Sequence, residues 1–151
     1  MMPTPAEPPR PVAQRREDVL ALLETERHLW LASADADRPH LVPFAYAWDG
    51  ECLTILTRRT SRTVRNLQGS GLARVALGTA RDVVLVDAAP EFIEPEEADE
   101  RTSALFASLP MDPRRVPGVI GVRLRPRRIL AWRSLSEMRD RVVMRDGHWV
   151  G

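Results

Sequence analysis

The sequence of 151 residues contains no lysine, and all 22 of its basic residues are arginines. A chain without lysine has no side-chain amine for a Schiff base and no lysine for a nucleotide-binding phosphate loop, so both kinds of chemistry are excluded. The 22 arginines are balanced by 21 acidic residues, which leaves a net charge of +1. The protein as a whole is therefore not expected to bind a polyanion, and any anion site must be local.

Cysteine and the common catalytic and metal-binding motifs are also lacking. Cys52 is the only cysteine, so no internal disulfide can form, and there is no CxxC motif. The three histidines, His28, His40 and His148, are not spaced as metal ligands, so no metal site is predicted. GxSxG and HExxH are missing as well, and no catalytic residue is assigned.

Long apolar runs are missing too. No stretch approaches the roughly 20 consecutive apolar residues that span a membrane. Residues 1–13 carry five prolines and lack the apolar core of a signal peptide, so we predict that they form a disordered tail. Residues 14–151 are expected to fold as a single domain, because this length buries a core without disulfides or metal. No membrane partner is expected, and the unpaired cysteine favours a cytoplasmic location.

The apolar pattern predicts an α+β chain that is mainly β. Residues 14–26 have the period of an amphipathic helix, and further helices are predicted from Thr60 or Ser61 to Gly69 and from Glu94 onward. The predicted strands are 28–33, 39–48, 51–57, 73–77, 82–86, 119–132 with a bend at Pro126, and a final hairpin over 141–150. Many short strands with tight turns favour a closed barrel, because a barrel has no exposed edges.

One stretch of the sequence is suited to binding an anion. Residues 57–67 join a predicted strand to a predicted helix and contain four arginines. The N-terminus of a helix carries partial positive charge and unpaired N–H groups, so a phosphate is its natural ligand, with Arg62 and Arg58 or Arg65 adding charge-assisted hydrogen bonds. The alternative is a solvated basic turn with an ordinary helix cap.

Three segments together carry a resemblance to a known family. They are residues 31–43, the turn Trp48-Asp49-Gly50, and residues 61–67, which begin Ser61-Arg62-Thr63. In this order and at this spacing the sequence resembles the pyridoxamine 5′-phosphate oxidase-like split β-barrels, which bind flavins and include a deazaflavin-dependent branch. The resemblance extends from about Gln14 to Trp132.

The resemblance implies a six-stranded Greek-key split β-barrel that forms a homodimer and binds its cofactor in a groove between the subunits. By position, Val42 and Pro43 would lie along the flavin ring, and Leu56 and Thr57 would contact the ring or the ribityl chain. Ser61 and Arg62 would hold the phosphate. Thr63 departs from the family pattern, because many members have a lysine there. Arg62 or Arg58 could replace that lysine, since arginine binds phosphate bidentately.

Two functions follow from the resemblance. The first is a redox protein that uses FMN or a deazaflavin, coenzyme F-420, to reduce or oxidise a small organic substrate. The lack of an acid–base motif agrees with it, because a flavin performs hydride transfer itself. The second is a non-catalytic protein of the same fold that holds heme or a flavin for sensing or storage. A nucleic-acid-binding barrel is disfavoured by the near-zero net charge and an aromatic content of 5%.

Overall fold

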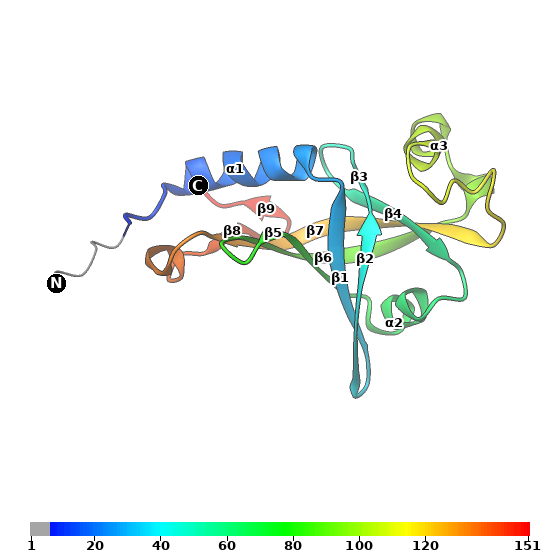
Figure 1. Cartoon of the computed structure of the whole chain (residues 1–151), viewed down its shortest axis with the longest axis horizontal. Coiled ribbons are helices and arrows are strands. Elements are labelled where there is room, and N and C mark those ends of the chain that lie inside the picture. The colour runs from blue at the N-terminus through cyan, green and yellow to red at the C-terminus, as the bar shows by residue number, and fades with distance from the viewer. Residues whose placement is uncertain (1–6) are drawn as a thin grey trace.

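The computed structural model of the chain describes residues 7–151. The elements in chain order are α1 (Val12–Thr25), β1 (His28–Asp35), β2 (Arg38–Ala45), β3 (Ala47–Trp48), β4 (Leu53–Arg58), α2 (Arg62–Ser70), β5 (Ala73–Thr79), β6 (Asp82–Ile93), the 3-10 turn η1 (Pro95–Glu97), α3 (Glu100–Ala107), β7 (Val119–Trp132), the 3-10 turn η2 (Leu135–Glu137), β8 (Val142–Arg145) and β9 (His148–Trp149). Within these residues the strands form one antiparallel sheet that the helices flank (Figure 1). The prediction of a mainly β chain with α-helices is confirmed.

The order of the strands explains how the sheet curves into a barrel. It runs β2-β1-β5-β6-β7-β4-β3, and β8 pairs with both β7 and β9. Only Tyr46 separates β2 from β3 along the chain, yet β2 pairs with β1 at one end of this order and β3 pairs with β4 at the other. Residues 38–48 therefore join the two ends of the sheet, as the predicted split β-barrel requires. The sequence predicted one strand over 39–48, and the break at Tyr46 lets this segment change its partner strand.

The long strands β6 and β7 contain the predicted bend. Their register shifts between Asp87 and Ala88, whose partners on β7 are Arg128 and Pro126, so Arg127 is bulged out. A bulge suits this position because proline has no N–H to donate to the neighbouring strand. The final hairpin is also confirmed, since Asp146 and Gly147 both have positive φ, as a two-residue hairpin turn requires.

The apolar residues form two clusters. In the main one, Val19 and Leu23 of α1 pack over strand residues such as Leu31, which is fully buried. The second lies under α3 and consists of Leu56, Ile93, Phe106, Leu109 and Val119. A side chain at Gly121 on β7 would overlap the ring of Phe106, so α3 packs closely on the sheet because residue 121 is glycine.

Two helix boundaries differ from the predicted ones. Helix α2 continues through Gly69 and ends at Ser70, because the left-handed position after the helix is filled by Gly71, with φ of 68°. The helix predicted from Glu94 is first a 3-10 turn, and α3 begins only at Glu100, where the side chain of Asp99 accepts a hydrogen bond from the N–H of Thr102. Among the described residues, no helix is long and apolar enough to cross a membrane.

The N-terminal segment is ordered earlier than the predicted boundary at Gln14. Residues 1–6 of the predicted tail lie outside the described residues, but α1 begins at Val12. Just before it, the Arg10 guanidinium donates to both carboxylate oxygens of Glu137, at 2.9 and 2.8 Å, and to Asp18 at 2.8 Å. Arg10 thus connects the start of the chain to η2 near its end.

Candidate functional site

The passage from β4 into α2 forms the helix start that the sequence predicted. Ser61 is the N-cap, and its hydroxyl oxygen accepts a hydrogen bond from the N–H of Val64 at 3.2 Å. This cap leaves the N–H groups of the first helical turn without carbonyl partners, and they carry the positive end of the helix dipole. Arg62 is the first residue of α2 and Arg65 lies one turn later, so both project from the same face of the helix.

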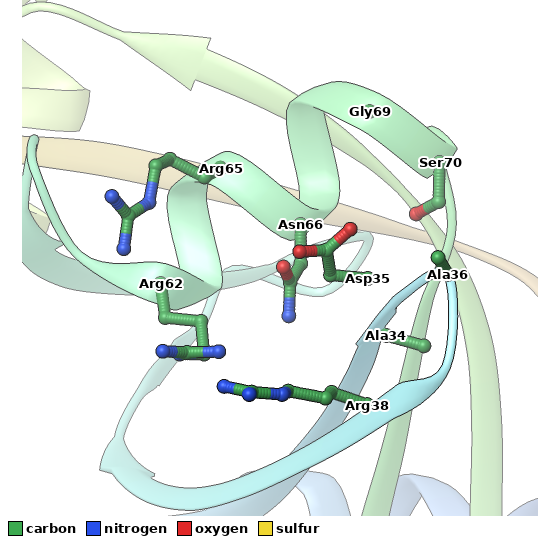
Figure 2. Close-up of a pocket in the computed structure, with 9 residues that line it drawn as sticks. All are labelled: Ala34, Asp35, Ala36, Arg38, Arg62, Arg65, Asn66, Gly69 and Ser70. Carbon is green, nitrogen blue, oxygen red and sulfur yellow. The ribbon is translucent and has the colours of Figure 1, made fainter.

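That face of α2 borders a cavity of about 660 Å³, which we call the arginine pocket. Its lining residues are Ala34, Asp35, Ala36, Arg38, Arg62, Arg65, Asn66, Gly69 and Ser70. They come from α2 and from the tip of the β1–β2 hairpin, which extends beyond the rest of the sheet (Figure 1). Figure 2 shows Arg38 of β2 and Arg62 of α2 extending toward one another, with Arg65 one turn further along the helix.

The three arginines of this pocket have no acidic partner in the described part of the chain. None of the ion pairs among residues 7–151 includes Arg38, Arg62 or Arg65. Like charges that face one another across a cavity repel, and an anion between them removes that repulsion. The pocket is therefore suited to a phosphate or another anion.

Arg59 also belongs to residues 57–67, but it forms an ion pair with Glu94. Its Nε donates to Glu94 at 3.0 Å, and this pair lowers the pKa of the Glu94 carboxyl group below its ordinary value. Arg58 is exposed and does not line the pocket. The structure thus separates the four arginines of the basic turn, because only Arg62 and Arg65 border the cavity.

Of the eight residues that the resemblance assigned to the cofactor, only Arg62 lines the arginine pocket. Leu56 is buried under α3, and Thr57 and Thr63 are 6% and 2% exposed. Val42 is partly buried on β2 and Pro43 is exposed on the same strand. Since Thr63 is buried, the position that holds a lysine in many family members does not supply a group to the pocket in this chain.

Sequence reasoning did not identify Arg38, Asp35 or Asn66. The predicted strands ended at residue 33 and began again at residue 39, whereas in the structure Asp35 and Arg38 are paired strand residues on either side of a two-residue turn. Nothing in the sequence indicates that this hairpin tip lies against α2. Asn66 could have been noticed, because it lies one turn after Arg62 and is a polar residue on the inner side of the helix.

A second and wider cavity, of about 920 Å³, lies between the end of α1, residues 45–50 and the end of α3. Tyr46 borders it, and its hydroxyl donates to the carbonyl oxygen of Leu23 at 2.8 Å. Burial, together with the charge of Glu26, raises the pKa of Tyr46 to about 12. Tyr46 therefore stays protonated at neutral pH and attaches α1 to the sheet. Residues 7–151 contain no group of three His, Cys, Asp or Glu side chains that could hold a metal ion.

Comparison with known proteins identifies relatives at the level of the family. The model of the family described as pyridoxamine 5′-phosphate oxidase matches residues 16–133. No curated protein matches the sequence significantly.

Several solved structures share the fold. A FAD-binding protein from Mesorhizobium loti is 16% identical, with a TM-score of 0.63 over 76% of this chain and 89% of that chain. The heme storage protein HutZ from Vibrio cholerae is 17% identical, with a TM-score of 0.63 over 81% and 98%. An F420 reductase is 20% identical, with a TM-score of 0.56 over 72% and 93%. By their descriptions these three proteins bind or use different cofactors.

Proposed function

The chain belongs to the pyridoxamine 5′-phosphate oxidase family, and from this we propose that it binds a phosphorylated flavin-type cofactor, FMN or a deazaflavin, and transfers hydride to or from a small organic substrate. The observation that carries the proposal is the arginine pocket, where three arginines without acidic partners among the described residues line a cavity that extends along α2 from Arg62 to Ser70.

The charges in the pocket suit a phosphate group. Three arginines and Asp35 give the lining a net formal charge of +2. A phosphate monoester carries a charge of about −1.5 to −2 at pH 7, so the two nearly balance. Arg38 and Arg65 supply the cations that Thr63 does not, and each guanidinium can form two parallel hydrogen bonds to phosphate oxygens.

The protein residues and the cofactor have separate tasks in this proposal. A bound flavin or deazaflavin supplies the hydride chemistry. The arginines of the pocket hold the phosphate and so set the position of the remainder of the molecule. The pocket itself is lined mainly by polar groups, so the ring system has to lie outside it, along the apolar side chains of β2 that the family resemblance indicates.

Binding measurements with two flavins test this proposal. FMN and riboflavin differ only in the phosphate, so FMN should bind at least tenfold more tightly, because charge-assisted hydrogen bonds contribute roughly 1.5–3 kcal/mol each. The absorbance spectrum of the purified protein distinguishes a flavin, a deazaflavin and heme. Equal affinities for FMN and riboflavin would contradict the phosphate site.

The alternative function is a non-catalytic protein of the same fold that stores or senses heme or a flavin. It is supported by the similarity of the fold to that of the heme storage protein HutZ. Anaerobic addition of a reduced nicotinamide to the cofactor-loaded protein separates the two functions. Bleaching of the bound cofactor supports the oxidoreductase, whereas a heme spectrum supports storage.

We also propose that the protein is a homodimer, and the supporting observation is an apolar face of the β1–β2 hairpin. Trp30 is 50% and Leu41 is 61% exposed. The strand register places Trp30 opposite Pro43 and Leu41 opposite Ala32, so these side chains share one face. A contiguous exposed apolar face of this kind is typical of an interaction surface.

Light scattering at micromolar concentration should therefore give the mass of a dimer, and Leu41→Asp should give a monomer, because it places a charge in the apolar face. Leu135→Asp is the matched control. Leu135 is 91% exposed on η2, outside that face, and its replacement should leave the dimer intact. A monomeric wild-type protein would contradict the proposal.

A further inference from the structure

We propose that a third cavity of the protein binds a small carboxylate that carries a single aromatic ring. This cavity, which we call the tryptophan cavity, has a volume of about 220 Å³. It lies between the turn after β3, the bulge of β7 and the β8–β9 hairpin, and these segments contribute Trp48, Glu51, Arg125, Arg127, Met144 and Trp149 to its lining. It shares no lining residue with the arginine pocket, so the inference does not depend on the proposed cofactor site.

The two tryptophans give the cavity an aromatic wall at the edge of the core. Trp48 is paired with Leu53, and Trp149 with Met144, across antiparallel strands. Residues that are directly opposite in such a pair project from the same face of the sheet. Leu53 and Met144 belong to the main core cluster, and both tryptophans pack against it while remaining partly exposed. The indoles are therefore supported by the core and are also accessible from the cavity.

The strand that carries Trp149 lies beside α1 (Figure 1), and Arg16 of that helix covers one face of its ring. The guanidinium carbon of Arg16 is 5.2 Å from the ring centroid. A ligand in the cavity therefore meets the other face or the edge of the Trp149 ring. Aromatic rings attract one another in both of these arrangements, stacked with an offset or edge to face.

The cations of the cavity come from the bulge of β7. Arg127 is the bulged residue, and the N–H of Gly147 donates to its carbonyl oxygen at 2.8 Å. The Nη1 atom of Arg127 lies 2.9 Å from the place where a Cβ atom at Gly147 would be, so its guanidinium lies over the hairpin turn that borders the cavity. None of the ion pairs among residues 7–151 includes Arg127.

The charge of the lining favours a ligand with one negative charge. Arg125 also borders the cavity, and its Nη1 is 3.9 Å from Oε2 of Glu51. Their side chains are 52% and 80% exposed, so water screens this contact and weakens it. Two arginines and one glutamate leave a net formal charge of +1. A carboxylate matches this charge, and a guanidinium binds it through two parallel hydrogen bonds.

The volume of the cavity limits the ligand to one ring. An engineered cavity of about 150 Å³ in another protein binds benzene, whereas sites for drug-sized molecules measure roughly 300–1,000 Å³. At about 220 Å³ the tryptophan cavity accommodates a benzene ring with its carboxylate. The three-ring system of a flavin is too large for it. Benzoate is thus the simplest probe of the site.

NMR spectroscopy of the ¹⁵N-labelled wild-type protein tests the proposal. The chain has four tryptophans, so its indole N–H groups give four signals. Titration with benzoate should shift the signals of Trp48 and Trp149, whereas those of Trp30 and Trp132, which do not line the cavity, should stay in place.

Two analogues separate the contributions of the charge and of the ring. Benzamide has the shape of benzoate without its charge and should bind at least tenfold more weakly. Cyclohexanecarboxylate keeps the charge but has no aromatic ring, and it should bind roughly two- to tenfold more weakly. Unshifted signals of Trp48 and Trp149, or equal affinities for benzoate and either analogue, would overturn the proposal.

Arg127→Gln should weaken the binding of benzoate about tenfold and leave that of benzamide nearly unchanged, because it removes the cation that pairs with the carboxylate. Arg128→Gln is the matched control. Arg128 is the next residue of β7, is also exposed and does not line the cavity, so its replacement removes the same charge without touching the site. Equal losses in the two variants would mean that benzoate responds to net charge alone and would contradict the assignment of Arg127.

Discussion

Arg62→Ala is expected to weaken the binding of FMN, or of a deazaflavin, by about ten- to a hundredfold, because it removes a guanidinium from the phosphate site. Arg62 lines the arginine pocket and is the first residue of α2, where the helix dipole and the N–H groups of the first turn also favour an anion. Arg38 faces it across the cavity, so loss of Arg62 removes one of the two α2 guanidinium groups that lie opposite Arg38 (Figure 2).

The apoprotein should keep its stability in this variant. Arg62 is exposed and has no ion-pair partner among the described residues, so its loss should change the free energy of unfolding by less than about 0.5 kcal/mol. Arg59→Ala is the matched control, because Arg59 belongs to the same turn but is paired with Glu94 away from the pocket. Its replacement should leave cofactor affinity nearly unchanged. Unchanged affinity of Arg62→Ala for both cofactors would mean that the phosphate binds elsewhere.

Arg10→Ala is expected to lower the free energy of unfolding by about 3 kcal/mol, because it leaves a buried carboxylate without its cation. Glu137 is 2% exposed. Its Oε2 accepts hydrogen bonds from the backbone N–H and the Nε of Arg10. Its Oε1 accepts hydrogen bonds from the Nη2 of Arg10 and, at 2.8 Å, from the backbone N–H of Arg133. The variant loses the cation and its two side-chain hydrogen bonds, and only the backbone N–H groups of residue 10 and Arg133 still donate to Glu137. Urea denaturation measures the effect.

Arg74→Ala provides the matched control for this experiment. Arg74 also pairs with an aspartate, Asp87, but its side chain is 50% exposed. Exposed ion pairs contribute about 0–1 kcal/mol, so its replacement should have a much smaller effect on unfolding. Equal losses in the two variants would contradict the view that burial of Glu137 makes the Arg10 contact important.

The contact between Arg10 and Glu137 also predicts how the stability of the protein depends on pH. The hydrogen bonds from Arg10 lower the pKa of Glu137 from 4.5 to about 2, against the effect of burial. Since the folded pKa lies below the unfolded one, this contribution is complete above pH 4.5 and is lost as pH falls toward 2. It amounts to roughly 3 kcal/mol at neutral pH, since one pKa unit corresponds to about 1.4 kcal/mol. The difference in stability between wild type and Arg10→Ala should therefore shrink over this acidic range.

Much of the barrel was predictable from local patterns. Alternating or β-forming residues placed β1, β4, β5 and β7, and Pro126 and Asp146-Gly147 marked the bulge and the last turn. These features depend on residues that are neighbours in the sequence. The order of the strands, and the change of partner at Tyr46, depend on pairings between distant segments, which no local pattern records.

Arg10 shows that local patterns also miss the distant contacts of the N-terminal segment. Five prolines and few apolar residues indicated a tail over residues 1–13. The stabilising contact of Arg10 is a carboxylate 127 residues away, so composition of the segment itself does not reveal it.

For the anion site, the sequence by itself determined that arginine supplies the cations and that two of these arginines share a face of α2. The absence of lysine meant that arginine had to bind any anion, Ser61 marked the helix start, and a spacing of three residues put Arg62 and Arg65 on one face of α2. Only the tertiary structure decided which other arginines take part. Arg59 is neutralised by Glu94, 35 residues further along the chain. Arg38 lines the pocket from the β1–β2 hairpin, whose Ser33 is hydrogen-bonded to Asn66 of α2. Side chains that carry the same charge differ in function according to the partners that folding brings to them, and those partners are distant in the sequence.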